Sequence, residues 1–398
     1  MSSGLTKASV VTAIAFLTLS ALVVPSGSAG SQAKWTFAIY MCSDNDLDYW
    51  GELNTDWLKD VGSTDDVKFV VLWDTSDGPA NLYRVDKKKM VEMTDYEYNG
   101  MEVNMGDPKI LGSFVEYLAD KFPSDNLLLD LWDHGDDFRG ICFDDNTGTK
   151  DDEDYLTHQE ITAALNGRSL SVIAADGCGL GVIEVAYEYA MNGVTAEWFV
   201  ANENYVPLQG FPYDMIAADL VANPGMTPEQ LAKDMVMRYP ELYQKGWLTE
   251  LAAIKLPAVP EMVSELWDVT SILMSDMQAY RGMVAAGRGQ ATMGWSQYGW
   301  EGYVDFPTIF EVIYSRADTG SDLQIQTGEL LASIEAAIPY VSASQPADVW
   351  DPEGMSVYFP SADGSYKHNT WWRGSLYPNM QFAQDGWIDF LDSYWNSL

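Results

Sequence analysis

Five short apolar runs recur along the first half of the chain and constrain its fold more than any other feature. They are WTFAIYM (35–41), VKFVVLW (67–73), NLLLDL (126–131), LSVIA (170–174) and WFVA (198–201). Their length suits strands, and their nearly continuous apolar character is typical of strands buried on both faces of a parallel sheet. We therefore expect a mostly parallel sheet between about residues 34 and 225.

Helical segments separate these runs. Apolar residues at helical spacing predict helices over about 47–58, 108–122 and 182–189. A capping box formed by Thr157 and Glu160 opens a further short helix that ends near residue 165. Two short segments around a charged turn, 81–84 and 89–93, predict a hairpin at the sheet edge. The pattern indicates an α/β fold with helices covering the sheet.

Beyond residue 225 the pattern changes. Residues 227–239 and 260–288 have helical periodicity, residues 354–361 predict a strand, and 384–391 predict a short amphipathic helix. No Gly/Ser-rich or Pro-rich linker separates the two halves. We therefore expect residues 34–225 to form the α/β domain and residues 226–398 to pack against it.

The first thirty residues have the features of a signal peptide. Lys7 is their only charge, an apolar run of about 15 residues follows from Val10 to Val24, and small residues come next. This run is shorter than the roughly 20 residues that span a bilayer, which disfavours the alternative of an uncleaved anchor. We predict a signal peptide over residues 1–29, extending to Ala33 at most, and a secreted or cell-surface protein without a later membrane segment.

The charge of the chain excludes one class of partner. Lys and Arg number 22 against 59 Asp and Glu, which gives a net charge of −37. Such a surface repels phosphate backbones and attracts cationic ligands, so we expect no nucleic-acid partner. We expect a monomer.

Reactive side chains follow two of the predicted strands. His134 and Gly135 come directly after 126–131, and Cys178 follows 170–174 with a glycine on each side. Carboxyl ends of parallel strands share one edge of a sheet, and a connection with one helix suits neighbouring strands. We therefore expect Cys178 and His134 to share one rim.

This pairing suits acyl transfer. An imidazole can take the proton of a thiol, and the backbone N–H groups of Gly135 and Cys178 are candidate donors to the developing oxyanion. Asp176 would point the same way as Cys178, because residues two apart in an extended segment share a side. Since its carboxylate would disfavour the thiolate, pairing with a cationic substrate side chain is its expected role.

Several motifs together resemble the clostripain-like cysteine peptidases, relatives of gingipains, legumains, separases and caspases. In chain order they are YMCSDNDLD, LWDHG, ADGCGLGVIEVAYE, ANENYVPLQGFPYD, GYVDF and GMSVYFP. The resemblance implies a caspase-like fold and a secreted endopeptidase that cleaves after Arg or Lys through an acyl-enzyme. It implies roles for four residues and places two more at the pocket wall: Cys178 as nucleophile, His134 as base, Gly135 as oxyanion donor, Asp176 as specificity acid, and Glu203 and Asn204 as polar contacts.

The connection between His134 and Cys178 contains an acidic segment, DDNTGTKDDED (144–154). It is either a solvated loop or a calcium site, and the candidate ligands are Asp144, Asp145, Asp151 and Asp152. The spacing is not that of an EF-hand, because Tyr155 stands where that loop requires Glu. The chemistry itself needs no cofactor. Since the resemblance implies a zymogen activated by a cut in this connection, we expect self-cleavage after Lys150.

Three points stay open at the level of the sequence. Cys42 and Cys142 are either buried separately or paired with each other. A non-catalytic binding or adhesion protein on the same fold is the alternative function. A same-fold peptidase that cuts after Asn or Asp is a third reading, which the carboxylate of Asp176 disfavours because like charges repel.

Overall fold

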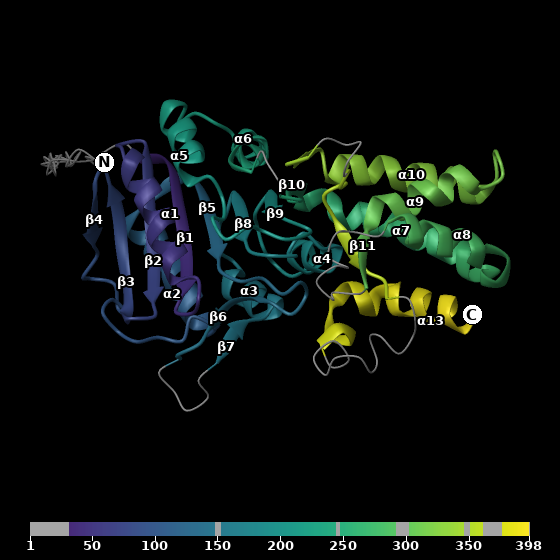
Figure 1. Ribbon diagram of the computed structural model, residues 1–398, viewed down its shortest axis with the longest axis horizontal. Coiled ribbons are helices and arrows are strands. Elements are labelled where there is room, and N and C mark those ends of the chain that lie inside the picture. Colours follow the sequence, from purple (N-terminus) through teal and green to yellow (C-terminus); the bar gives the residue numbers. More distant parts are fainter. Residues whose placement is uncertain are drawn as a thin grey trace, which may run out of the picture. The chain divides into compact units, whose positions relative to one another are not determined.

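A nine-stranded sheet lies at the centre of the protein (Figure 1). The computed structural model describes residues 32–147, 153–243, 247–291, 302–345, 351–360 and 376–397. The strand order is β12-β10-β9-β8-β5-β1-β2-β3-β4. Its five parallel strands are the five predicted ones, β1 (Ala33–Ser43), β2 (Val67–Thr75), β5 (Ser124–Trp132), β8 (Val172–Asp176) and β9 (Trp198–Ala201). The predicted α/β class is confirmed.

Antiparallel strands complete both edges of the sheet. The predicted hairpin forms one edge as β3 (Gly78–Asp86) and β4 (Lys89–Glu92). At the other edge, β10 (Glu250–Lys255) pairs with β9 and with β12 (Tyr340–Ala343). Both of these strands follow residue 225, so the sheet extends beyond the limits expected for it. Their short sequences, ELAAIK and YVSA, carry too little periodic signal to be recognised.

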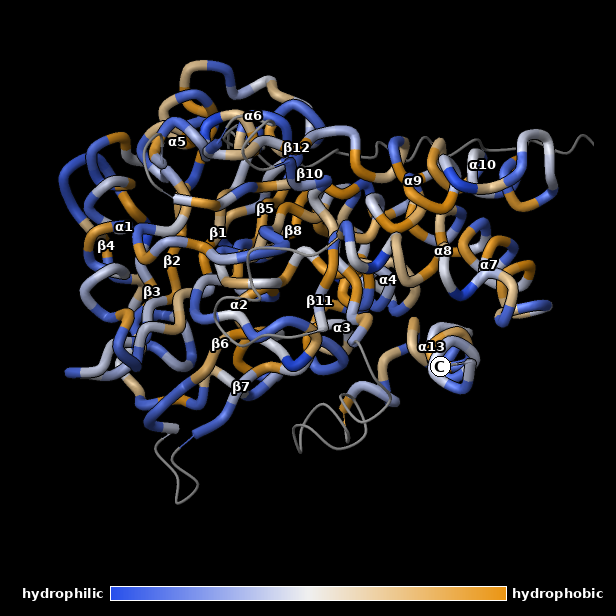
Figure 2. The backbone as a smooth tube through the Cα atoms, turned by 45° about the vertical axis from the view of Figure 1, so that its right-hand side comes forward, coloured by the Kyte–Doolittle hydropathy of each residue, from blue (hydrophilic) through white to orange (hydrophobic). Residues whose placement is uncertain are grey.

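Helices cover both faces of the sheet, as the continuous apolar character of the strands requires. Phe37 and Ile39 of β1 pack on one face, whereas Ala38 and Tyr40 pack on the other. The central strands therefore contribute much of the orange interior in Figure 2. The covering helices are α1 (Asp48–Val61), α5 (Tyr213–Ala222) and α6 (Pro228–Leu242) on the first face, and α2 (Pro108–Lys121), α3 (His158–Leu165) and α4 (Ile183–Met191) on the second. The predicted capping box at Thr157 is confirmed.

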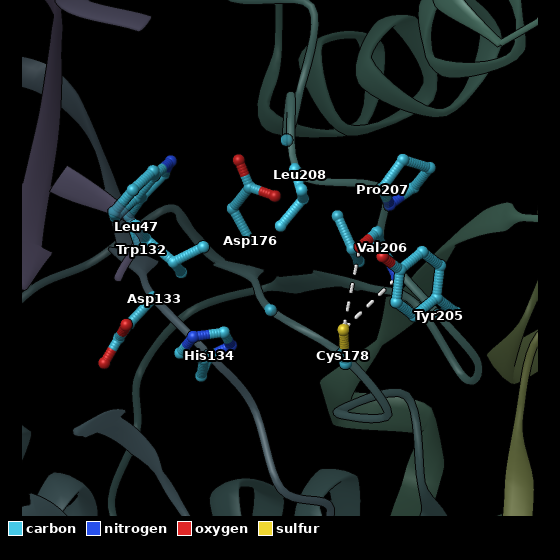
Figure 3. Close-up of a pocket in the computed structure, with 12 residues that line it drawn as sticks. Leu47, Trp132, Asp133, His134, Asp176, Cys178, Tyr205, Val206, Pro207 and Leu208 are labelled. Atoms are coloured by element: carbon cyan, nitrogen blue, oxygen red, sulfur yellow. Dashed lines mark hydrogen bonds between the residues drawn. The ribbon is translucent and has the colours of Figure 1, made fainter. Parts of the chain in front are cut away.

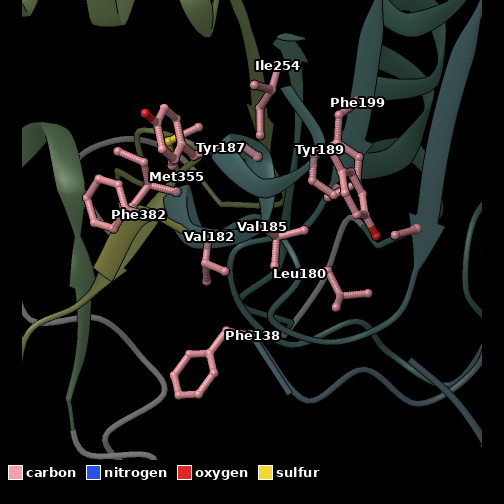
Figure 4. Close-up of a cluster of buried hydrophobic side chains, with 14 of the residues drawn as sticks. Phe138, Leu180, Val182, Val185, Tyr187, Tyr189, Phe199, Ile254, Met355 and Phe382 are labelled. Carbon is pink, nitrogen blue, oxygen red and sulfur yellow. The ribbon is translucent and has the colours of Figure 1, made fainter. Parts of the chain in front are cut away.

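The C-terminal region shares the second of these cores. Figure 4 shows Tyr187 of α4 near Met355 and Phe382, and all three belong to one continuous buried cluster. The helix predicted over 260–288 is two helices, because the backbone turns at Asp276, whose side chain accepts from the Ala279 N–H. The helices of this region are α7 (Val259–Ser275), α8 (Met277–Gln290), α9 (Phe306–Arg316), α10 (Asp322–Ala337) and α13 (Ile388–Asn396).

Short elements make up the rest of the described structure. Two small hairpins are β6 (Ile141–Asp144) with β7 (Asp154–Leu156), and β11 (Tyr303–Asp305) with β13 (Ser356–Tyr358). Short helical turns are η1 (Leu256–Ala258), η3 (Tyr377–Asn379) and η4 (Ala383–Trp387).

The predicted signal peptide lies outside the described residues. Ala33, the later of its two expected cleavage positions, is the first residue of β1. In the described part of the chain, none of the helices combines the length and the apolar character that crossing a bilayer requires.

Two glycines with the same φ test how tightly the sheet and helix layers pack. Gly62 follows α1 and Gly167 follows α3, each with φ of +75°. A Cβ at Gly62 would lie 2.1 Å from the Lys87 backbone nitrogen, whereas a Cβ at Gly167 would meet nothing within 4 Å. The two positions thus share a positive φ but differ in the space around them.

We expect Gly167→Ala to lower the free energy of unfolding by about 1 to 2 kcal/mol, the cost of a left-handed residue. Gly62→Ala adds overpacking to that cost and should lose about 2 to 5 kcal/mol in total. Urea unfolding of both variants measures the difference. Equal losses in the two variants would show that the β3–β4 turn shifts to accommodate the added Cβ of residue 62 at little cost.

Candidate active site

His134 and Cys178 line the same pocket (Figure 3). Trp132 at the end of β5 pairs in register with Asp176 at the end of β8, and each reactive side chain follows two residues later. The structure thus brings together the two residues that the strand pattern placed on one rim. The pocket is small, about 90 Å³, and its other walls include Leu47, Tyr205 and Leu208.

The thiol of Cys178 contacts the neighbouring loop. Its Sγ accepts from the Val206 N–H at 3.4 Å and lies 3.7 Å from the Val206 carbonyl oxygen. Burial raises the pKa of Cys178 to about 12, and nearby Asp176 contributes to the rise. The hydrogen bonds of the described residues do not join Cys178 to His134. The raised pKa therefore favours the protonated thiol at neutral pH.

The imidazole of His134 contacts a loop from the first strand. Its Nε2 lies 2.6 Å from Asp46 Oδ1, in the loop between β1 and α1. Asn45 holds this loop, because its side-chain amide donates to Asp133 Oδ1 and to the Phe143 carbonyl, each at 2.8 Å. Asp46 was not among the predicted site residues. Its signal was an Asp-Asn-Asp sequence at the carboxyl end of a central strand, on the same edge as His134.

Gly135 approaches the nucleophile through its backbone. A Cβ at this position would lie 2.4 Å from the Cys178 carbonyl oxygen and 2.8 Å from the Cys178 nitrogen. Only glycine allows such an approach. The two backbones expected to supply oxyanion donors therefore lie against each other.

Asp176 lies in the same pocket, and Figure 3 shows its carboxylate between Trp132 and Leu208. Its Oδ2 accepts from the Phe211 N–H and faces the Tyr213 hydroxyl, each at 2.8 Å, while Oδ1 has no hydrogen-bond partner. Burial raises the pKa of Asp176 to about 7. A cation placed in the pocket would favour the ionised form and would offer Oδ1 a partner.

Asp130 lies behind Asp176 and shares a partner with it. The Tyr213 hydroxyl is 2.7 Å from Asp130 Oδ2 as well as 2.8 Å from Asp176 Oδ2. A hydroxyl has one proton, so it donates to one carboxyl group and accepts from the other, which must be protonated. Burial, and then the charge of Asp176, raise the pKa of Asp130 well above its usual value. Asp130 is therefore the neutral member of the pair.

Glu203 and Asn204, expected at the pocket wall, do not line the pocket. Both are buried, and Glu203 accepts from the Gly354 N–H at 3.2 Å. The Asn204 carbonyl pairs with the Gly179 N–H at 2.7 Å. The residues that follow them form the wall instead: Tyr205, Val206, Pro207 and Leu208. The segment that the resemblance pointed to therefore reaches the pocket through the residues that follow Glu203 and Asn204.

The remaining predicted residues lie beside the pocket or outside the described chain. Asp144 is buried at the end of β6, and Asp145 is exposed. Lys150, Asp151 and Asp152 lie outside the described residues. Cys42 and Cys142 are buried free thiols in contact with each other, so the structure has them adjacent but not bonded.

Comparison with known sequences identifies related proteins. A sequence model of the clostripain family, Peptidase_C11, matches residues 39–332. The clostripain of Hathewaya histolytica is 34% identical over 141 residues, which are 32% of this chain and 27% of that protein. The chain thus spans about a quarter of the length of this curated relative.

Two solved structures share the fold. An inactive zymogen C11 protease from Parabacteroides distasonis superposes with a TM-score of 0.67 at 16% identity, over 89% of this chain and 98% of that one. A secreted C11 cysteine protease from Bacteroides thetaiotaomicron, in complex with an irreversible peptide inhibitor, gives 0.63 at 14% identity, over 91% and 99%. The fold implied by the resemblance is thereby confirmed. Since the family match extends over most of the sequence, the chain belongs to the clostripain family of cysteine peptidases.

Proposed function

We propose that this protein is a secreted endopeptidase that cleaves after Arg or Lys, with Cys178 as nucleophile and His134 as base. One observation carries the proposal: Asp176, with an unpartnered carboxylate oxygen, lines the pocket shared by Cys178 and His134. A guanidinium or ammonium group entering that pocket would satisfy the oxygen. An acidic substrate side chain would instead meet a like charge.

The proposed reaction follows from the side chains at the rim. His134 takes the Cys178 proton, and the thiolate attacks the scissile carbonyl carbon. The backbone N–H groups of Gly135 and Cys178 stabilise the oxyanion. As the tetrahedral intermediate collapses, His134 protonates the leaving amine, which departs and leaves an acyl-enzyme. Water then releases the acyl group, with His134 again as base. These steps use no cofactor.

Activation is the second part of the proposal. The contact of Cys178 Sγ with Val206 and the raised thiol pKa support a resting enzyme that must open before it reacts. We propose that self-cleavage after Lys150, between the segments that carry His134 and Cys178, relieves this state. The similar Parabacteroides distasonis protein is described as an inactive zymogen, which supports the idea.

Location and substrate charge complete the proposal. The predicted signal peptide supports secretion, and the similar Bacteroides thetaiotaomicron protease is described as secreted. A net charge of −37 would attract basic peptides to the enzyme. A monomeric state is also part of the proposal, and calcium bound at Asp144 is a separate proposal.

The first prediction concerns specificity. The chain from Ser31 onward should hydrolyse fluorogenic peptides ending in Arg or Lys, and not those ending in Asn or Asp. Cys178→Ala should reduce turnover at least about a thousandfold, as loss of a catalytic nucleophile does. Cleavage after Asn or Asp would overturn the assignment of Asp176. If the folded, reduced enzyme hydrolyses none of the four peptides, the result would favour the alternative of a binding protein.

The second prediction concerns maturation. Incubated wild-type protein should yield two fragments that meet after Lys150, because the peptidase cuts after basic residues. Lys150→Ala and Cys178→Ala should each remain one band on denaturing gels, and Lys150→Arg should still be cut. An intact wild-type band in protein that hydrolyses peptides would exclude self-cleavage.

The third prediction concerns the cost of burying Asp176. Because its folded pKa of about 7 exceeds the unfolded value near 3.8, the folded state binds the extra proton between these limits. The contribution of Asp176 to stability is therefore present at low pH and is lost as pH rises toward 7. Asp176→Asn lacks this loss, so its Tm minus that of wild type should increase from pH 5 to pH 8.

The same variant should lose about a hundredfold in kcat/KM for Arg peptides, because a charged hydrogen-bond partner is gone. The matched control is Asp318→Asn, which removes an exposed carboxylate and should give a Tm difference independent of pH. A flat difference for Asp176→Asn as well would show that this carboxylate is not titrating across the window.

A further inference from the structure

Three buried carboxylates meet at the carboxyl edge of the sheet, outside the peptidase pocket. Asp44 directly follows β1, Asp74 lies near the end of β2, and Asp144 ends β6. One oxygen of each lies within 4.8 Å of the others, and the three residues are at most 5% exposed. The ion pairs found within the described ranges include none of them. Three negative groups are thus confined together without a Lys or Arg.

Among the three carboxylates, only Asp144 has both oxygens hydrogen-bonded. Asp144 accepts from the Met105 N–H at 2.7 Å and from the Asn146 N–H at 2.9 Å. Neither oxygen of Asp74 has a hydrogen-bond partner, and Asp44 Oδ2 has none either. A fully buried carboxylate with both oxygens unpartnered is costly unless a cation or a proton neutralises it. The buried carboxylate of Asp74 therefore requires a cation or a proton.

The electrostatics of the triad agree with this reading. Burial, followed by the charges of Asp144, Glu102 and Asp44, raises the pKa of Asp74 to about 9. Burial, followed by the charges of Asp144 and Glu102, raises the pKa of Asp44 to about 6. Glu102 is exposed beside them and adds a fourth carboxylate toward solvent. A cation entering there would replace protons and relieve the repulsion among the four groups.

We propose that Asp44, Asp74 and Asp144 bind one calcium ion, with Glu102 at the entrance. Calcium takes oxygen ligands at about 2.3 to 2.6 Å, so two of its ligands lie no more than about 5 Å apart, which the triad satisfies. A set of carboxylates alone suits a hard cation rather than zinc or copper. Magnesium demands a tighter octahedral arrangement and retains its waters more strongly, so it should bind less well.

This site differs from the one expected from the acidic segment. It shares only Asp144 with that segment, while Asp145 is exposed beside it. The other two ligands are Asp44, directly after β1, and Asp74, in β2, which lie 100 and 70 residues earlier in the chain. No linear spacing motif reveals such a site, because parallel pairing of β1 with β2 brings these ligands together.

The position of the site connects it to the proposed peptidase. Asp44 precedes Asn45, which bonds Asp133, and Asp46, which contacts His134. Asp144 precedes the connection that contains Lys150. Bound calcium would therefore hold the loop that orients the imidazole, and this consequence, unlike the site itself, rests on the proposed function.

The binding test uses full-length mature Cys178→Ala protein, which cannot process itself. After removal of metal with EGTA and dialysis, titration calorimetry with calcium chloride up to 5 mM should show one site. Saturating calcium should raise the Tm by several degrees, because a ligand that binds only the folded state stabilises it. Magnesium at the same concentration should give a smaller shift.

Substitutions in this background separate binding from folding. Asp74→Asn should abolish the calcium-induced shift and yet melt at or above the metal-free parent, because it removes a repelling charge. Asp44→Asn provides a second variant with the same expectation. Asp145→Asn, which changes an exposed neighbour in the same acidic segment, should keep the full shift.

No calcium-dependent shift or heat in the parent protein would overturn the proposal. An undiminished shift in both Asp74→Asn and Asp44→Asn would overturn it as well, by placing the ion elsewhere. Since these measurements use a catalytically dead protein, their outcome is independent of the peptide assays. Absence of peptide hydrolysis would not contradict the calcium site, and absence of calcium binding would not contradict the peptidase activity.

Discussion

The pairing of β5 with β8 is the constraint on which the site depends. Trp132 lies opposite Asp176, and the Asp133 N–H donates to the Asp176 carbonyl at 3.2 Å, so the register is maintained to the last residue of both strands. Both faces of these strands are buried under helices, and a slip of one residue would turn every side chain to the wrong face. The sheet core thus fixes where His134 and Cys178 emerge, although neither side chain belongs to it.

Burial of negative charge is the second organising feature. Asp176 and Asp130 share the Tyr213 hydroxyl near the pocket, and Asp44 and Asp74 lie at the same edge of the sheet without an ion-pairing Lys or Arg among the described residues. Each buried carboxylate destabilises the fold in its ionised form, and a matching cation would reverse that penalty. The structure thereby holds unfavourable electrostatic energy at positions where a cationic ligand can release it. Because Lys and Arg are scarce in the sequence, cations that pair with these carboxylates would come from outside the chain.

Much of this arrangement could be predicted because it depends on local patterns. Apolar runs identified the parallel strands, and strand ends identified His134, Cys178 and Asp176 as neighbours. Which residues of the loop after β9 line the pocket could not be read in this way, since Asn204, whose carbonyl accepts from the Gly179 N–H, is buried outside the lining. The triad that includes Asp44 and Asp74 was equally hidden, because its members meet only through strand pairing and burial. Asp130 did leave a signal, as the single charged residue within NLLLDL.

The loop after β1 couples these features within three consecutive residues. Asp44 belongs to the carboxylate triad, Asn45 donates to Asp133 Oδ1, and Asp46 contacts His134. Successive side chains of one short loop cannot move independently, because each shares a peptide unit with the next. A change in charge at the triad would therefore reach the imidazole through backbone geometry rather than through a long chain of contacts. Repulsion among the buried carboxylates would loosen this loop, and its neutralisation would hold the contact between Asp46 and His134.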